Sequence, residues 1–159
     1  MTKSVDNQKH DSSSAYQREL ETIILRTFEL KPFPDELKAD GFHIDGYSEE
    51  DGRITCLAEI YTSLGKLSTG GRRKILSDMY KLVTYKAIKK LSNVSLKIIL
   101  TSSEASNALN SDSNSNSWVK KSLEQHDIKV IHHQLNPEQE QKLKEVRELQ
   151  KVGNKKKKK

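Results

Sequence analysis

Apolar residues along the chain follow two different spacings, and their alternation predicts an α/β fold. The spacing is helical from Tyr16 to Phe28 and again from about Gly71 to Lys90. The segments Phe42–Ser48 and Ile54–Thr62 instead have the composition and period of β-strands. The sequence EEDGR between them contains Asp-Gly, a strong hairpin signal, so we expect an antiparallel pair of strands.

The second half of the chain continues this alternation. The segment VSLKIILTS, which starts at Val94, is short and continuously apolar, as is typical of a central buried strand. It is followed by a helix over Trp118–His126, a strand in IKVIHHQL and a last helix that begins at Asn136 or Pro137. This order of elements predicts a mixed sheet of about four strands with helices on both faces, which is a three-layer α/β domain.

We expect this domain to span residues 13–150. The segment 1–12 is polar and is predicted to be disordered, and so is the basic tail at 151–159. Five consecutive lysines at 155–159 account for most of the net charge of +6, and the rest of the chain carries only +1. A basic tail gives salt-sensitive attraction to phosphates, although a solvated tail that serves only solubility fits the composition equally well.

Composition also limits which cellular compartment and which partners we expect. No apolar run approaches the roughly 18 residues that a membrane span needs, so a membrane is not an expected partner. Cys56 is the only cysteine, it lies in a strand-like segment, and the first residues lack the apolar stretch of a secretory signal. We therefore expect a cytoplasmic protein with a reduced, buried cysteine.

Two acidic residues, Asp45 and Glu59, lie within the two strands of the predicted hairpin. If the turn is the three residues Asp51 to Arg53, then Glu50 pairs with Ile54. Counting back along both strands places Asp45 opposite Glu59 on one face. A two-residue turn would shift this pairing by one, so the register is an assumption.

Two carboxylates this close repel each other unless one charge is removed. A divalent cation, a nearby Lys or Arg, or a raised pKa on one acid would each remove the repulsion. Carboxylate oxygens are ligands that suit Mg²⁺ or Mn²⁺. Asp45 and Glu59 are therefore candidate metal ligands.

The helix that follows the hairpin carries basic groups. Lys74, Asp78 and Lys81 recur at helical spacing and form a polar stripe beside the buried one. The preceding loop, SLGKLSTGGRRK, has glycines that allow backbone approach and two arginines near free helix N–H groups. Such a loop fits a contact with phosphate, and the residues expected to bind nucleic acid are Lys66, Arg72, Arg73 and Lys81.

The combination resembles the PD-(D/E)XK nuclease superfamily, whose members have the restriction-endonuclease-like fold. The shared features are a first helix with an acid, a strand ending in Asp, a hairpin turn, a strand carrying Glu and a helix carrying Lys, over about Tyr16–Thr101. The resemblance implies a Mg²⁺- or Mn²⁺-dependent nuclease that hydrolyses phosphodiester bonds, with DNA as the expected substrate. Asp45 and Glu59 would bind the metal, and Glu19 on the first helix would complete the site.

The chain departs from the family pattern in three ways: Ile44 precedes Asp45 where the family has Pro, the short first strand of the family core is not obvious, and the lysine has moved. The family's lysine stands two residues after the Glu, where this chain has Tyr61. Some members take the lysine from the following helix, which makes Lys74 the implied catalytic lysine beside Asp45 and Glu59. Lys66 and Lys81 are weaker choices.

Two other interpretations of the same residues stay open. Glu59 can form a salt bridge with Lys74 or Lys81, while Asp78 bridges both lysines, and the cluster is then purely structural. A nuclease-like domain can also bind nucleic acid or a protein partner without cutting, through the tail and the two arginines of the loop. The near-neutral body suggests that a nuclease would bind DNA as a homodimer or in a larger assembly.

Overall fold

The computed structural model describes residues 5–111 and 116–156, and the chain divides into two compact units. The sheet unit comprises residues 24–134, and the helical unit comprises the described residues up to 23 together with those from 135. The segment 13–150, expected to form one domain, is thus shared between the two units. Of the two ends expected to be disordered, residues 1–4 and 157–159 lie outside the described residues.

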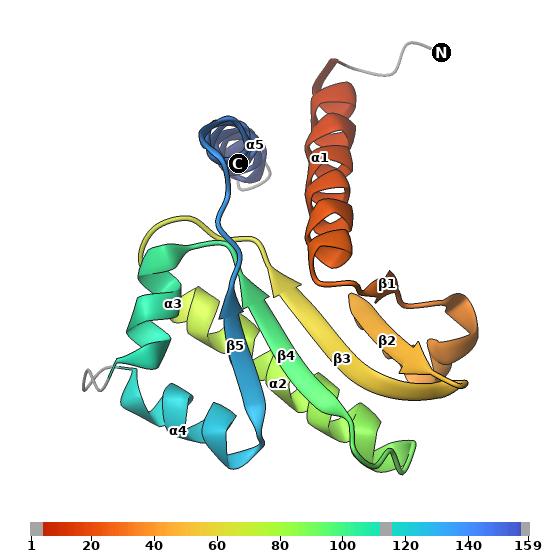
Figure 1. Cartoon of the computed structure of the whole chain (residues 1–159). Coiled ribbons are helices and arrows are strands. Elements are labelled where there is room, and N and C mark those ends of the chain that lie inside the picture. The colour runs from red at the N-terminus through yellow and green to blue at the C-terminus, as the bar shows by residue number, and fades with distance from the viewer. Residues whose placement is uncertain (1–4, 112–115, 157–159) are drawn as a thin grey trace. The chain divides into compact units, whose positions relative to one another are not determined.

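The sheet unit is built on one mixed sheet. Its strands are β1 (Lys31–Pro32), β2 (Gly46–Glu50), β3 (Arg53–Tyr61), β4 (Ser95–Leu100) and β5 (Ile128–His132), and they lie side by side in chain order (Figure 1). Strands β1, β2 and β3 pair antiparallel, whereas β3, β4 and β5 pair parallel. The predicted α/β class and mixed sheet are confirmed, with five strands in the described residues instead of about four.

The additional strand is β1, which lies in the segment KPFPDELKADG. A two-residue strand has no periodicity that a sequence can display, so only its place in the fold identifies it. Pro32 has no N–H to donate to a neighbour, which is acceptable because β1 is at the edge of the sheet. The rest of the segment forms two short 3₁₀ turns, Asp35–Leu37 and Ala39–Gly41.

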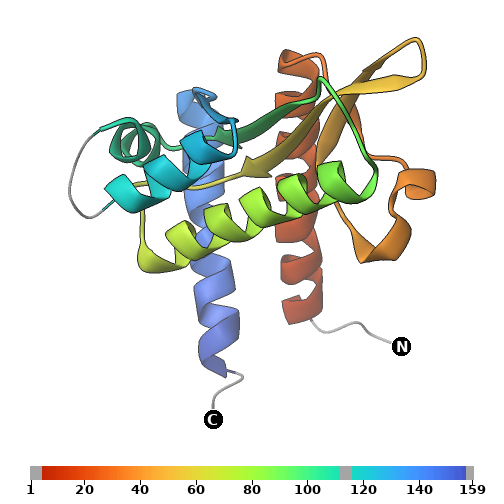
Figure 2. The same cartoon turned by 90° about the horizontal axis from the view of Figure 1, so that it is seen from below.

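Three helices lie on one face of this sheet (Figure 2): α2 (Thr69–Ile88), α3 (Ser103–Asn110) and α4 (Ser117–Gln125). A serine caps the N-terminus of each of the first two. The Ser68 hydroxyl accepts from the Gly71 N–H at 3.0 Å, and the Ser102 hydroxyl accepts from the Ala105 N–H at 3.2 Å. Helix α3 is not among the elements that the sequence analysis predicts, and its cap explains why a helix can begin at this place.

The core of the sheet unit lies between that face and the three helices. Apolar residues from α2 pack against alternate residues of β3 and β4, as the period-2 pattern of the strands requires. The principal contributors are Leu57, Ile75, Met79, Leu82, Leu96, Ile98, Leu100, Leu109, Val119 and Leu123. Cys56 is also buried and free, as its strand context predicts.

The helical unit contains most of α1 (Val5–Thr27) and the whole of α5 (Pro137–Lys156). The first turn of α5 is closed by a capping box, in which Asn136 and Gln139 each donate a backbone N–H to the other's side chain, at 3.0 and 2.8 Å. Leu143, Val146 and Leu149 follow one another at helical spacing; the first two are buried, whereas Leu149 is 45% exposed. No helix among the described residues is long and apolar enough to cross a membrane.

Both long helices extend beyond the limits that the sequence suggests. Helix α1 begins at Val5, inside the segment 1–12 that was expected to be disordered, and α5 runs to Lys156, inside the expected tail 151–159. Extending an existing helix costs less than starting one, so a helix started by an amphipathic segment can continue into a polar one. Low hydrophobicity alone therefore did not locate the helix ends.

The turn of the β2–β3 hairpin has two residues, Asp51 and Gly52, not the three that the sequence analysis assumes. Both have positive φ, 50° and 75°, which suits the Asp-Gly sequence and the twist of a tight hairpin. Glu50 consequently pairs with Arg53. Taken alone, this turn would have moved Asp45 out of register with Glu59 by one residue.

A β-bulge restores the register. Thr55 is an extra residue on β3, because its neighbours Cys56 and Ile54 pair with Ser48 and Glu49, which are adjacent in β2. Beyond the bulge, Gly46 pairs with Ala58. The expected facing of Asp45 and Glu59 therefore holds, although the route by which the sequence analysis reached it is wrong.

Asp45 is not inside a strand, because β2 begins one residue later, at Gly46. A Cβ atom at position 46 would lie 2.3 Å from Leu25 Cδ2, so only glycine lets the end of α1 pack this closely on the start of β2. Leu25 is itself buried. This contact fixes the chain where it enters the strand and thereby positions Asp45.

We predict that Gly46→Ala lowers the free energy of unfolding by about 1–3 kcal/mol, because the new methyl group must displace the packed Leu25 side chain. Chemical denaturation measures the change. Gly70→Ala is the matched control, since a Cβ there meets only Ser68 Oγ, at 3.9 Å, and alanine suits a helix better than glycine. Equal stability of Gly46→Ala and the wild type would show that the close packing is not required.

Candidate functional site

Glu59 is the most unusual side chain in the sheet. It lies on β3, between β2 and β4, on the face that α2 covers, and it is only 1% exposed. Its neighbours on the same face of β3 are apolar or aromatic, Leu57 and Tyr61. A carboxylate in such a place costs several kcal/mol of solvation unless charges or hydrogen bonds compensate it.

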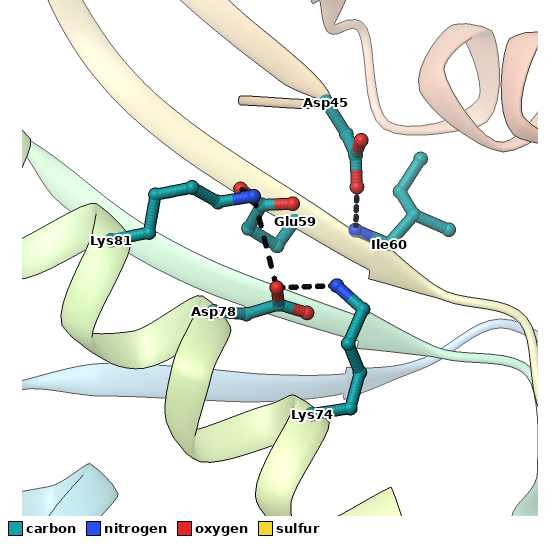
Figure 3. A network of polar contacts seen from close by, with 6 residues as sticks. All are labelled: Asp45, Glu59, Ile60, Lys74, Asp78 and Lys81. Carbon is teal, nitrogen blue, oxygen red and sulfur yellow. Dashed lines mark hydrogen bonds and ion pairs between the residues drawn. The ribbon is translucent and has the colours of Figure 1, made fainter. Parts of the chain in front are cut away.

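Asp45 reaches the same place from the start of β2. The ladder between β2 and β3 ends at the pair of Gly46 and Ala58, which leaves the next N–H on that side of β3 without a strand partner. Asp45 Oδ2 accepts this N–H, from Ile60, at 2.8 Å (Figure 3). The hydrogen bond holds the Asp45 carboxylate beside Glu59, at the open end of the hairpin.

Helix α2 contributes three charged residues to the cluster. Lys81 Nζ lies 2.6 Å from Glu59 Oε1 and 3.8 Å from Asp78 Oδ1. Asp78, 1% exposed, is also in contact with Lys74, whose Nζ lies 2.5 Å from Oδ1. Figure 3 shows Asp78 on the turn of α2 between the two lysines, which reach it from either side. We call the five residues Asp45, Glu59, Lys74, Asp78 and Lys81 the acid–lysine cluster.

The electrostatics of the cluster are set mainly by burial. Burial, followed by the neighbouring Asp45 carboxyl, raises the pKa of Glu59 to about 9, against the opposing effect of Lys81. Glu59 is therefore protonated at neutral pH when only the chain's own groups surround it, and the Lys81 ammonium contacts a neutral carboxyl group. Burial also raises the pKa of Asp78, although Lys74 and Lys81 counteract this effect.

The number of charged groups in the cluster also favours a proton on Glu59. Three carboxylates and two ammonium groups would together carry one excess negative charge inside a buried site. A proton retained on Glu59 removes it. A bound cation would remove it as well, and would then take the place of that proton.

The carboxylate oxygens of the acid–lysine cluster can be compared with the ligands that a divalent metal ion needs. Among the described residues, Asp78 Oδ2 and both oxygens of Glu59 are buried without a hydrogen bond of good geometry. No group of three or more His, Cys, Asp or Glu side chains that could hold a metal occurs in the same part of the chain. Two carboxylates still fit Mg²⁺, which is commonly bound through one or two carboxylates while water and substrate supply the other oxygens. Asp45 and Glu59 would be the residues that hold it.

The structure thus brings together only part of the predicted site. Asp45 and Glu59 face each other, but the lysine in contact with Glu59 is Lys81, and Lys74 contacts Asp78 instead. Helical spacing placed both lysines on the right face of α2, yet it does not tell which amine reaches which acid. Glu19 is exposed and belongs to the helical unit, so its part in the site stays a prediction.

The residues expected to bind nucleic acid divide into two groups. Lys66 and Arg73 are exposed on the loop before α2 and on its first turns. Arg72 is half-buried and donates hydrogen bonds to Asn116 Oδ1 at 3.2 Å and Thr69 Oγ1 at 3.0 Å, and Lys81 is engaged by Glu59. Arg72 therefore ties α2 to the start of α4, and the sequence held no signal of this contact.

The sequence predicts that Asp78 bridges two lysines, but it does not indicate that this residue is buried. It stands among the buried positions of α2 between Ile75 and Met79, where an apolar residue would have been the simplest choice. The available signal was its spacing from the two lysines, which suggested a bridge but not its near-complete burial.

Comparison with known protein families, curated proteins and solved structures gives no match for this chain.

The raised pKa of Glu59 predicts a specific dependence of stability on pH. Between the ordinary pKa of a glutamate and the folded value of about 9, the folded state binds a proton that the unfolded state does not. The stability contributed by this proton is complete below the unfolded pKa and is lost as the pH rises toward 9. Glutamine keeps the shape of the protonated acid and cannot ionise.

We therefore expect Glu59→Gln to become more stable relative to the wild type as the pH rises from 5 to 9 in metal-free buffer, by on the order of 1 kcal/mol or more. Chemical denaturation at several pH values measures this difference. Glu50→Gln, at an exposed position in the same hairpin, should follow the wild-type curve at every pH. Parallel curves for wild type and Glu59→Gln would show that Glu59 has no raised pKa.

Proposed function

We propose that the protein is a metal-dependent nuclease of the restriction-endonuclease-like fold, which hydrolyses phosphodiester bonds of nucleic acid, with DNA as the expected substrate. The observation that carries the proposal is the place of Asp45 beside Glu59 at the open end of the β2–β3 hairpin, with lysine ammonium groups from α2 in the same network. Apolar residues in place of a buried ion pair are often neutral or stabilising, so packing alone gives no reason for three carboxyl groups and two lysines at this place.

The order of elements supports the proposal further. A helix, a three-stranded antiparallel meander, a helix and a parallel strand follow one another as α1, β1, β2, β3, α2 and β4. The same order is expected for a PD-(D/E)XK core, and β1 supplies the short first strand that the sequence did not display. The proposed fold also implies three layers, with helices on both faces of the sheet, and we propose this arrangement together with the function.

The charges of the cluster suit a phosphodiester substrate. When bound, a divalent ion lowers the pKa of a coordinated water and offsets charge on a phosphoryl oxygen. Asp45 and Glu59 would hold this ion, and Glu59 would then be ionised. With a divalent ion present, the cluster carries one excess positive charge, which the single negative charge of a phosphodiester balances.

The lysines would act directly on the substrate. Lys74 is the more accessible of the two, with its side chain 49% exposed against 28% for Lys81. An ammonium group at the mouth of the site can donate to a phosphate oxygen and stabilise the charge that develops during hydrolysis. Exposed Lys66 and Arg73 would attract the backbone on either side of the scissile bond.

A second candidate function is favoured by one contact. The ammonium group of Lys81, 2.6 Å from Glu59 Oε1, already gives this carboxyl group a cationic partner without a metal. A protein that keeps this pair permanently would bind nucleic acid or another protein without cutting. This interaction module differs from the nuclease in needing no divalent ion at Asp45 and Glu59.

The nuclease proposal predicts metal-dependent nicking of supercoiled plasmid that depends on both acids. With Mn²⁺ or Mg²⁺ added, the wild type should nick, and Asp45→Asn and Glu59→Gln should each reduce the rate by at least about 100-fold, because each removes a charged metal ligand. Calorimetric titration with Mn²⁺ should show binding in the wild type that both variants lose. Glu50→Gln is the matched control, an acid-to-amide change on the same hairpin that should alter neither measurement.

Two results would contradict the proposal. Nicking that persists unchanged in Glu59→Gln would come from another enzyme in the preparation. Absence of both Mn²⁺ binding and nicking in the wild type would favour the interaction module. In that case, metal-independent binding of DNA that weakens as salt rises would be the property to measure.

A further inference from the structure

Asp78 is buried at a position where the fold needs no charge. It lies on the inner face of α2 beside Ile75, Met79 and Leu82, all of which pack in the core. Replacing a buried ion pair by apolar residues of similar size is often neutral or even stabilising, so packing alone gives no reason for an acid here. The acid is better explained by what it contacts.

Those contacts are two lysines of the same helix, one on each side. Lys74 precedes Asp78 by four residues and Lys81 follows it by three, so both side chains can reach one carboxylate oxygen. Both distances are to Oδ1, 2.5 Å from Lys74 and 3.8 Å from Lys81. Asp78 Oδ2 is buried without a hydrogen bond of good geometry among the described residues.

The two lysines differ in what else they contact. Lys81 also lies 2.6 Å from Glu59, so it would keep an acidic partner if Asp78 were absent. Lys74 contacts only one acid among the described residues, which is Asp78. Partial burial would lower the pKa of Lys74, but the hydrogen bond and charge of Asp78, with smaller effects of Glu59 and Asp45, raise it.

We propose that Asp78 is a positioning residue, which holds the ammonium group of Lys74 beside the facing carboxyls of Asp45 and Glu59. A lysine side chain has four rotatable bonds, and an unrestrained one would spend most of its time in solvent. The buried carboxylate restricts it to the side of α2 that faces the acids (Figure 3). The role in catalysis rests on the proposed nuclease function, whereas the positioning of Lys74 does not.

The first test measures the lysine directly and needs no activity. Nuclear magnetic resonance of the lysine side chains, followed as the pH is raised, reports the pKa of Lys74. In Asp78→Asn we expect the pKa of Lys74 to fall, because its hydrogen-bonded counter-charge is gone. In Glu124→Gln, which removes the acid of an exposed pair with Lys120 on α4, Lys74 should titrate as in the wild type. An unchanged pKa of Lys74 in Asp78→Asn would overturn the proposal.

The second test asks whether Asp78 acts through Lys74. We expect Asp78→Asn to lower kcat by about 10- to 100-fold with little change in KM, as loss of a residue that orients a catalytic group does. Lys74→Met should lower kcat at least as much, and the double variant should be no worse than Lys74→Met alone. A residue that merely stabilised the fold would instead give losses that multiply in the double variant, and this result would overturn the proposal.

Folding and function are kept separate by two controls. The thermal midpoints of all variants show whether Asp78→Asn folds. If it does not fold, Asp78→Glu takes its place, because it keeps the negative charge and should leave the pKa of Lys74 as in the wild type. Absence of metal-dependent cleavage in the wild type would refute the proposed nuclease function. The pKa of Lys74 in the Asp78 variants would then still decide whether Asp78 positions that lysine.

Discussion

The burial of two carboxyl groups between the sheet and α2 is the constraint on which the rest of the site depends. Glu59 and Asp78 are each 1% exposed. Such groups must be neutralised by protonation, by cations of the protein or by a bound metal ion. In this protein, burial raises the pKa of Glu59, which favours its protonation, and two lysines of α2 contact the buried acids. Under the proposed nuclease function, a bound metal ion would take the place of the proton on Glu59.

The hairpin supplies the geometry that makes this possible. A two-residue turn and a bulge at Thr55 together determine that Asp45, and not its neighbours, faces Glu59. Either feature alone would turn the wrong side chain toward α2, since strand side chains alternate between faces. The close contact of Leu25 on Gly46 then fixes where the chain enters β2. Local features of the hairpin thus decide whether the two acids meet.

The sequence was informative where its patterns are periodic and uninformative where single contacts decide. Helical and strand spacing predicted α2, α4, α5 and the central strands, and the burial of Cys56. The two-residue strand β1 has no pattern, and the bulge at Thr55 leaves no mark in the composition. The facing of Asp45 and Glu59 was predicted because two errors, a turn too long by one residue and a missing bulge, cancelled. Which lysine reaches Glu59 depends on side-chain torsions, so helical spacing left Lys74 and Lys81 as equal choices for the salt bridge, and the structure has Lys81.

The most direct test of the account is anomalous X-ray diffraction from crystals grown with Mn²⁺. A manganese peak within coordination distance of Asp45 and Glu59, with the Lys81 ammonium displaced from Glu59, is the result that we predict. A difference map without manganese at this place, and with Lys81 still on Glu59, would contradict it. The acids would then be partners of the lysines and nothing more.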